Sequence, residues 1–280
     1  MSGRLILLFW LLIGVGCRAE VLPVHQPAPP MLPSPWLQRV AVLGASASAG
    51  FGVAAEVGEP LALRDFIDAA ILRDHQVAGG FANEFFFMNA AAHGRSLMDR
   101  ALEYEPTAVI AIDFLFWFGY GMFFREEDRL EFLEEGLAHL DRFHCPVVIS
   151  EIPDMSSAIG KMLMDVQVPK AETFGLLNAR IREWAAARPQ VVVAPLAPFL
   201  ETIKSGESVV IRDHVYPPGA FHELLQEDLL HPTTRGLAAL ALLSLNSLEQ
   251  LLPDVQDQIQ WDVNRLHDQV MQQLPAAEPR

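Results

Sequence analysis

The stretch RVAVLGASASAGFG at residues 39–52 combines a short apolar run with a loop of small residues. Residues 39–43 have the length and the uninterrupted apolar character of a buried strand. The three glycines of the following loop let a ligand approach the backbone closely, and we expect Ser46 to be exposed there. A serine in this place is a candidate nucleophile; a tight turn or a nucleotide cradle is the alternative interpretation.

Three common loop motifs are absent from this stretch. The dinucleotide motif requires Gly-x-Gly-x-x-Gly, and the phosphate loop requires a Gly-Lys-Ser/Thr ending. The Gly-x-Ser-x-Gly elbow is also incomplete, because Ser48 stands at the position of its last glycine. The loop therefore lacks the standard signals of nucleotide binding.

Beyond this stretch, apolar runs of strand length alternate with amphipathic runs of helix length. Residues 84–88, 108–112, 146–150 and 190–194 predict the other strands, and residues 61–74, 96–103, 126–143, 172–187, 235–252 and 255–273 predict helices. Such alternation indicates a parallel sheet covered by helices on both faces. We therefore expect one α/β domain over residues 37–280, with three α/β/α layers around a central, mostly parallel five-stranded sheet. Its binding site is expected at the carboxyl ends of the strands.

Composition and charge exclude several classes of protein. Hydrophobic residues make up 51% of the chain and charged residues 20%, which excludes intrinsic disorder. The formal net charge of −15 opposes a nucleic-acid partner, because phosphate backbones are bound through clustered basic side chains. Cys17 and Cys145 have none of the paired spacings of a zinc site, and Gln226 replaces the second histidine of His-Glu-x-x-His. We expect no metal and no cofactor.

The first nineteen residues have the pattern of an export signal. Arg4 precedes an apolar run at residues 5–16, which is too short to span a bilayer comfortably. Cleavage before Cys17 would leave a cysteine for lipidation and hence a membrane tether; cleavage after Ala19 and an uncleaved anchor are the alternatives. Six prolines in residues 20–36 predict an extended linker. The sequence therefore predicts an exported protein of the periplasm or cell envelope.

Two further segments carry residues suited to catalysis. In the run from Asp228 to Pro232, the acid can accept a hydrogen bond from one nitrogen of His231 and leave the other nitrogen facing a serine. A surface acid beside a packed histidine is the alternative. In the other segment, Asn89 is followed five residues later by Gly94, whose N–H group at a helix start suits a developing oxyanion.

Together, these three segments resemble those of the SGNH, or GDSL, hydrolase family. Their order is a Gly-x-Ser block, an Asn-x-x-x-x-Gly block and a closing Asp-x-x-His-Pro block, over roughly residues 38–245. The resemblance implies an SGNH-hydrolase-like, flavodoxin-like fold with Ser46 as the nucleophile, His231 as general base and acid, and Asp228 as its orienting partner. It also implies oxyanion donors at the amides of Ser46 and Gly94.

The chain departs from the family pattern in two places. Ala45 stands where the family has the acid of Gly-Asp-Ser, and residues 112–117 read Ile-Asp-Phe-Leu-Phe-Trp where the family has Gly-x-Asn-Asp. The asparagine that serves the family as third oxyanion donor is therefore missing. Loss of one such donor typically costs about 10²–10³ in kcat. His93 is one candidate replacement, and an ordinary loop histidine is the alternative.

Seven aromatic side chains fall within residues 114–124, where the family places a substrate loop. Core packing beneath the helix predicted at 126–143 explains most of them, but Gly119 and Gly121 indicate a loop. We therefore expect Trp117 and Tyr120 to contact an acyl chain or an apolar leaving group, with core packing as the alternative.

The sequence thus predicts an exported serine hydrolase that cleaves or transfers the acyl group of an ester through an acyl-enzyme. Its substrate would be a small-molecule, glycan or lipid ester. The alternative is an envelope protein that keeps the fold as a binding or assembly scaffold with degraded catalysis, which Ala45 and the missing asparagine favour. A nucleotide-binding parallel-sheet domain is a third interpretation.

Overall fold

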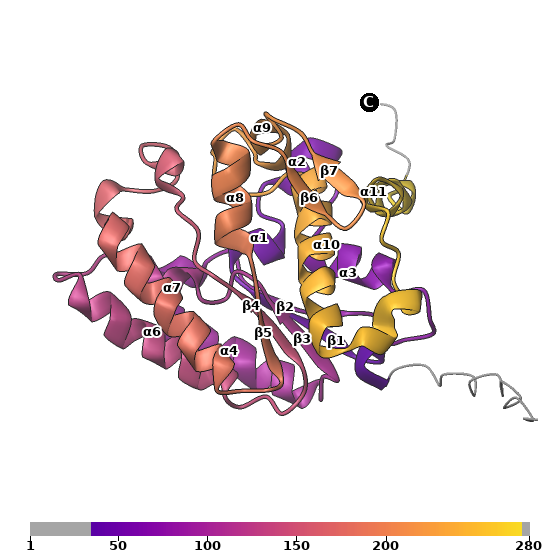
Figure 1. Cartoon of the computed structure of the whole chain (residues 1–280), viewed down its shortest axis with the longest axis horizontal. Helices are drawn as coiled ribbons and strands as arrows, with labels where there is room; N and C mark the ends of the chain where they lie inside the picture. Colours follow the sequence, from indigo (N-terminus) through magenta and orange to yellow (C-terminus); the bar gives the residue numbers. More distant parts are fainter. Residues whose placement is uncertain (1–34, 276–280) are drawn as a thin grey trace, which may run out of the picture. The chain divides into compact units, whose positions relative to one another are not determined.

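The computed structural model describes residues 35–275, and a five-stranded sheet lies at its centre (Figure 1). The strands are β1 (Val40–Gly44), β2 (Gly79–Ala82), β3 (Ala108–Ala111), β4 (Val147–Ser150) and β5 (Val191–Ala194). Their spatial order is β2-β1-β3-β4-β5, and all neighbouring pairs are parallel. The strand order reverses between β1 and β3, and the carboxyl ends of strands at such a switch point are where ligands bind in open α/β sheets.

Helices cover both faces of the sheet (Figure 1). One layer consists of α4 (Ala90–Glu103), α6 (Glu127–Leu140) and α7 (Ala171–Ala186). The other consists of α3 (Leu63–Ala70) and α10 (Thr234–Leu251), with α11 (Val263–Gln272) packed on both. The expected three-layer α/β/α fold with a parallel five-stranded sheet is therefore confirmed.

Shorter elements lie in the connections and bring side chains to the carboxyl edge of the sheet. They are α1 (Ser46–Ala49) and α2 (Val53–Val57) after β1, α5 (Phe116–Gly119) after β3, and α8 (Leu196–Lys204) after β5. An antiparallel hairpin of β6 (Val209–Ile211) and β7 (His214–Tyr216) then leads to α9 (Phe221–Leu224). Because α1, α5 and α8 begin within five residues of the ends of β1, β3 and β5, their first turns lie at the carboxyl edge of the sheet.

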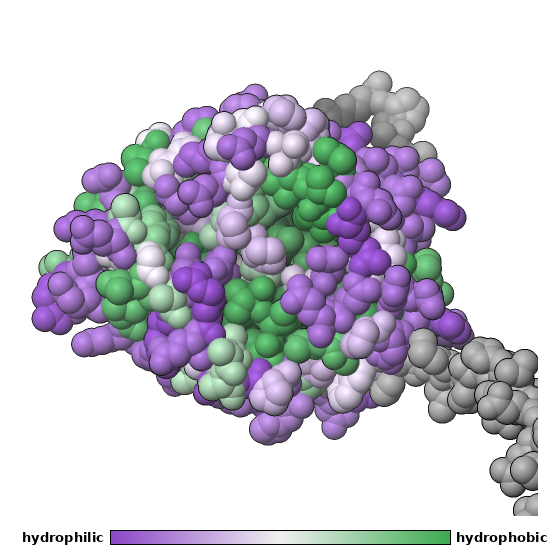
Figure 2. Space-filling view, viewed as in Figure 1, coloured by the Kyte–Doolittle hydropathy of each residue, from purple (hydrophilic) through white to green (hydrophobic). Residues whose placement is uncertain are grey.

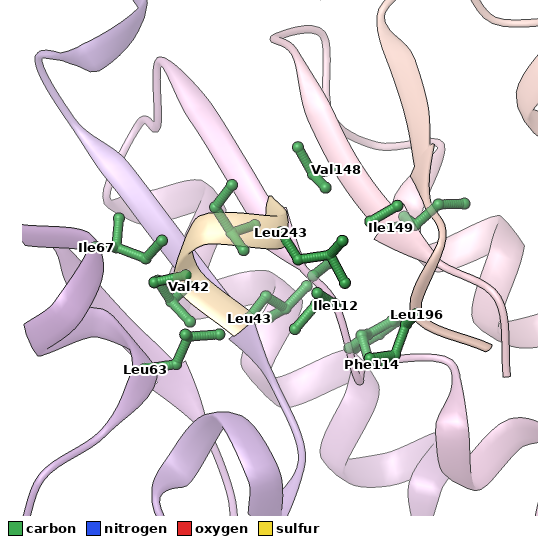
Figure 3. Close-up of a cluster of buried hydrophobic side chains, with 14 of the residues drawn as sticks. Val42, Leu43, Leu63, Ile67, Ile112, Phe114, Val148, Ile149, Leu196 and Leu243 are labelled. Atoms are coloured by element: carbon green, nitrogen blue, oxygen red, sulfur yellow. The ribbon is translucent and has the colours of Figure 1, made fainter. Parts of the chain in front are cut away.

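The sheet is buried on both faces, which explains the uninterrupted apolar runs of its central strands. Every residue of β1, β3 and β4 is buried. Figure 3 shows strand side chains such as Val42 and Ile149 in one apolar cluster with Ile67 of α3 and Leu243 of α10. This core fixes the point at which each strand ends and the polar loops begin.

The strand predicted at residues 84–88 is wrong. β2 is Gly79–Ala82, and residues 84–88 form a turn and the 3₁₀ helix η2 (Phe86–Met88). Phe86 is buried, whereas Phe85 and Met88 are 56% and 70% exposed, so this stretch has no buried face for a sheet. β2 lies at the edge of the sheet and is composed mostly of glycine and alanine, which have low strand propensity.

Three helix predictions also differ from the structure. The helix predicted at 61–74 is α3, which ends at Ala70, because Ile71 pairs with Ile259 in an isolated antiparallel bridge. α4 begins at Ala90 rather than at residue 96, because the side chain of Asn89 accepts a hydrogen bond from Ala92 N at 3.0 Å and caps the helix. The helix predicted at 255–273 is divided into the 3₁₀ helix η5 (Pro253–Gln258) and α11, which Asp262 caps. The earlier start of α4 moves Gly94 from a helix terminus into the helix interior.

The export signal predicted at residues 1–19, and residues 20–34 of the predicted linker, lie outside the described residues. Within residues 35–275, no helix combines the length and the apolar character needed to cross a membrane. Export therefore stays a prediction.

Candidate active site

Ser46, His231 and Asp228 form one hydrogen-bonded chain. Ser46 Oγ lies 3.0 Å from His231 Nε2, and His231 Nδ1 lies 2.6 Å from Asp228 Oδ2. The serine and the histidine are 185 residues apart in the sequence. The side chains of His231 and Asp228 are only 4% and 18% exposed, so bulk water is largely excluded from these three hydrogen-bonded side chains. In this arrangement an imidazole, oriented by a carboxylate, can take the proton of a hydroxyl and make it a nucleophile.

Ser46 lies at the carboxyl end of β1 and is buried, with 9% relative exposure, so the expectation that it is exposed is wrong. It is the first residue of α1, at the switch point between β1 and β3. Gly50 and Gly52 have φ of +74° and +79°, a left-handed conformation that lets the chain turn away directly after α1. The backbone N–H groups of Ser46 and Ala47 have no acceptor among the described residues. Two unpaired donors therefore lie next to the candidate nucleophile.

A tight turn places Asp228 against His231. Oδ1 of Asp228 accepts hydrogen bonds from the backbone N–H groups of Leu230 (2.9 Å) and His231 (3.0 Å), while Oδ2 contacts the imidazole. Leu229 has φ of +60°, a left-handed conformation that costs about 1–2 kcal/mol for a residue with a side chain. Burial by itself would raise the pKa of Asp228, but the hydrogen bonds from the imidazole and the two amides outweigh it and lower the pKa. Asp228 therefore favours the ionised form that orients the imidazole.

An apolar cavity lies beside Ser46 and His231. Its lining comes from the loops after β3 and β4 and from α8, α9 and α10, and includes Leu115, Phe116, Ile152, Met155, Leu196, Phe199, Leu224 and Leu240. Figure 2 shows apolar side chains gathered near the middle of one face of the molecule, around α10, within a hydrophilic rim. A mostly apolar lining with a few reactive polar groups is typical of a binding site for an apolar ligand group.

The predicted oxyanion residues Gly94 and His93 do not line this cavity. Only the N–H groups of the first turn of a helix lack acceptors within the helix. Gly94 is the fifth residue of α4 and therefore lies beyond that turn. A Cβ on Gly94 would meet the ring of Phe118 at 3.1 Å, so this glycine serves core packing. His93 Nδ1 lies 3.0 Å from Asn83 Nδ2. The expectation that Gly94 offers a free amide at a helix start is therefore wrong, because Asn89 starts the helix earlier.

The predicted pocket residues Trp117 and Tyr120 also do not line the cavity. Tyr120 is fully buried and stacks on Phe116, with 4.0 Å between the ring centroids. Its hydroxyl donates to Pro153 O at 2.9 Å and accepts from Met155 N at 2.8 Å. Trp117 is buried against neighbouring aromatic rings. Core packing, the alternative interpretation, therefore describes both residues, while the adjacent Phe116 reaches the cavity.

Two residues to which the sequence assigned no role contact the site. Gln226 Nε2 donates to Phe51 O and to Pro232 O, both at 2.7 Å, and thereby joins the loop after α1 to the segment of His231. Asp113 lies two residues beyond β3 and accepts hydrogen bonds from the turn that carries Ser46. Asp113 is the lone acid in the otherwise apolar run at 108–118, and this position is the one feature of the sequence that sets it apart.

Among residues 35–275, no three side chains of His, Cys, Asp or Glu converge in a way that could hold a metal ion. Cys145 is a free thiol of intermediate burial, and burial raises its pKa to about 11. It is not among the residues that line the cavity.

No protein-family model and no curated protein sequence matches the chain. Its structure is similar to that of a lipase/acylhydrolase from Enterococcus faecalis, with TM-score 0.53 and 14% identity over 80% of this chain and 97% of that chain. A gut microbial diltiazem-metabolizing enzyme has TM-score 0.49 and 16% identity over 75% of this chain; the match spans 46% of that longer chain. A psychrotrophic esterase from Pseudoalteromonas sp. has TM-score 0.45 and 16% identity, over 77% of this chain and 99% of that chain. The likeness to the lipase/acylhydrolase supports the fold, and the chemistry has to be inferred from the site itself.

Proposed function

We propose that this chain is a serine esterase that acts on esters of apolar acyl groups. Ser46 Oγ attacks the carbonyl carbon of the ester while His231 Nε2 takes the hydroxyl proton and Asp228 holds the imidazole. The histidine then gives that proton to the leaving alkoxide, so that the alcohol departs and an acyl-Ser46 remains. Water attacks this acyl group, His231 takes a proton from the water and returns one to Ser46 Oγ, and the carboxylic acid is released.

The unpaired N–H groups of Ser46 and Ala47 are the oxyanion donors of this proposal. Both residues lie in the first turn of α1 and line the cavity. In this mechanism, Ala47 supplies the second donor that the sequence had assigned to Gly94. The missing asparagine leaves the site one donor short of the family pattern, so we expect a kcat lower by about 10²–10³ than with all three donors.

The apolar lining of the cavity determines the proposed substrate class. Each methylene that moves from water into such a cavity gains about 0.8 kcal/mol, which corresponds to about a fourfold gain in kcat/KM. Glu151 also lines the cavity, but it is paired with Arg182, which offsets its charge. We therefore expect kcat/KM to rise along a series of acyl esters until the chain no longer fits.

The observation that carries the proposal is the hydrogen-bonded chain of Ser46, His231 and Asp228 beside an apolar cavity. Both contacts are within hydrogen-bond distance, and Ser46 and His231 line the cavity. The order of the motifs resembles that of SGNH, or GDSL, hydrolases. We infer a divergent member of that family, in which Ala45 and Asp113 stand in place of the usual residues.

Labelling with a fluorophosphonate probe tests the role of Ser46. The wild-type chain should be labelled, Ser46→Ala and His231→Ala should not, and Ser205→Ala, which changes an exposed serine elsewhere, should be labelled like the wild type. A p-nitrophenyl ester series from acetate to octanoate then tests the acyl specificity. A folded chain that neither reacts with the probe nor hydrolyses any ester would instead favour the binding or assembly scaffold.

We also propose that the protein is exported, with a membrane tether if Cys17 is lipidated. The apolar run at residues 5–16 after Arg4 supports export. Fractionation of bacterial cells that express the full chain tests this, because a processed envelope form is expected. The Cys17→Ser variant should leave the membrane fraction if lipidation holds the protein there. An unprocessed cytoplasmic chain would contradict export.

A further inference from the structure

Asp113, in the loop after β3, contacts the turn after β1 that carries Ser46. Its Oδ1 accepts a hydrogen bond from Ala45 N at 3.1 Å, and its Oδ2 accepts one from Ser48 N at 3.0 Å. The hydroxyl of Ser48 donates to Oδ1 at 2.5 Å. The two amides lie on either side of Ser46 in the sequence, so one carboxyl group fixes the backbone before and after the candidate nucleophile.

The backbone is built to admit this carboxyl group. Gly44 ends β1 immediately below the turn, and a Cβ at this position would lie 2.0 Å from Asp113 Oδ1 and 2.5 Å from Ser48 Oγ. A side chain at residue 44 would therefore displace the carboxyl group from its three donors. The absence of a side chain at Gly44 is therefore what leaves room for the carboxyl group of Asp113.

The position of Asp113 is costly, which argues against a passive role. The residue is buried, and among the described residues it has no ion-pair partner. Burial raises the pKa of Asp113, although the hydrogen bonds from Ser48 and Ala45 act in the opposite direction. A buried acid without a cation costs free energy, and the hydrogen bonds from Ala45 N, Ser48 N and Ser48 Oγ offset part of that cost.

We propose that Asp113 is a positioning residue, which keeps the amide and the hydroxyl of Ser46 aligned with His231. This inference rests on the proposed esterase function. Asp113 lines the cavity, but both of its oxygens are engaged by the turn, so it acts through Ser46 and not on the substrate. The chain thereby uses the carboxyl end of β3 to fix the nucleophile.

The test compares Asp113→Ala, Asp113→Asn and Ser48→Ala with the wild type in the full chain. We measure kcat and KM with p-nitrophenyl butyrate, the rate of fluorophosphonate labelling and the melting temperature. Misplacement of a reacting group by about 1 Å costs about 10²-fold, so Asp113→Ala should lower kcat and the labelling rate by about 100-fold. KM should stay within about threefold, because the cavity that holds the acyl group is unchanged.

The conservative variant separates positioning from a general loss of structure. The amide oxygen of Asp113→Asn can still accept hydrogen bonds from Ala45 N and Ser48 Oγ. The kcat of this variant should therefore be about tenfold or more higher than that of Asp113→Ala. Ser48→Ala removes one of the three hydrogen bonds and should fall between wild type and Asp113→Ala. Ser247→Ala, which removes a buried hydroxyl that bonds only within α10, is the matched control and should keep the wild-type kcat.

Each outcome decides the inference. A labelled wild type together with a wild-type kcat in Asp113→Ala overturns the positioning role and leaves the esterase proposal intact. The positioning role is also overturned if Asp113→Asn has no higher kcat than Asp113→Ala. It is likewise overturned if KM in Asp113→Ala rises by the same factor by which kcat falls. If Asp113→Ala does not fold, Asp113→Asn and Ser48→Ala still decide, because wild-type kinetics in both contradict positioning. An unlabelled wild type overturns both proposals.

Discussion

Gln226 and Phe51 lie 175 residues apart in the sequence and are joined by a 2.7 Å hydrogen bond from Gln226 Nε2 to Phe51 O. The same nitrogen donates to Pro232 O, and the ring of Phe51 lies 4.4 Å from that of His231, measured between centroids. One amide group therefore connects the loop after Ser46 to the segment that carries the histidine. We therefore expect the distance between Ser46 and His231 to depend on this connection.

Gln226→Glu should loosen the connection while keeping the size of the side chain. A carboxylate oxygen would then face two carbonyl oxygens without a proton to share, and an unsatisfied polar group at such a half-buried position costs about 1 kcal/mol or more. We expect the free energy of unfolding to fall by that amount, as measured by urea denaturation, and kcat to fall with it. Gln38→Glu is the matched control, since Gln38 donates to a single exposed carbonyl, and it should change stability little. Equal effects of the two substitutions would contradict the role of Gln226.

The substitutions Ser46→Ala, His231→Ala and Asp228→Asn should not be additive. In the proposed mechanism, each of the three residues acts through the others. Removing the serine or the histidine should therefore lower kcat by about 10⁴–10⁶-fold, and removing both should add little more. Single-turnover and steady-state kinetics on the single and double variants measure this. Additive losses would show that the three residues do not act as one unit.

Asp228 should stabilise the fold in a pH-dependent way. Its pKa is lower in the folded chain than the usual 3.8, so its contribution is fully present above that value and is lost as the pH falls through the folded pKa. The difference in unfolding free energy between the wild type and Asp228→Asn should therefore be constant from about pH 5 to pH 7 and shrink below about pH 4. Urea denaturation across this range measures it.

Asp113→Asn provides a comparison with the opposite sign. Burial raises the pKa of Asp113, so its protonated form stabilises the fold, and this contribution is lost as the pH rises through the folded pKa. The stability of the wild type relative to Asp113→Asn should thus increase as the pH falls. The same slope for both acids would contradict the environments described for them.

Tyr120→Phe should change substrate affinity from within the core. The hydroxyl of Tyr120 holds Pro153 O and Met155 N, and both residues line the cavity. Without it, KM should rise more for octanoate esters than for acetate, and stability should fall by about 1–3 kcal/mol. Tyr104→Phe, which removes an exposed hydrogen bond to Val77 O, is the control and should affect neither ester. An equal change in KM for both esters would contradict the idea that Tyr120 acts by holding the cavity residues Pro153 and Met155 in place.

The sequence predicted those parts of the fold that depend on local pattern. β1, β3, β4 and β5 have a continuous apolar signal, and the predicted ends of all four lie within one residue of the observed ends. The prediction for β2 is misplaced because Gly79 and Gly80 carry almost no strand signal, whereas residues 85–88 are all apolar although only Phe86 among them is buried. Hydrophobic character alone did not distinguish a sheet edge from the loop beyond it.

The site was predictable where its residues are close in sequence and unpredictable where they meet in space. Asp228 and His231 share one turn, so their pairing follows from a separation of three residues. Gly94 was misassigned because a cap at Asn89 shifted the start of the helix. Asp113 and Gln226 hold backbone groups of distant segments, and no local pattern encodes such contacts.

The left-handed conformation of Leu229 has a consequence for how the active chain assembles. It folds Asp228 back onto the amides that follow it, so the contacts that orient the carboxylate and the imidazole all lie within residues 228–231. The contact between Ser46 and His231 is the one link of the proposed triad that joins segments distant in sequence. A movement of α1 by about 1–2 Å would separate the hydroxyl of Ser46 from His231 while both segments stay folded. We therefore expect reactivity to be more sensitive than stability to changes at that contact.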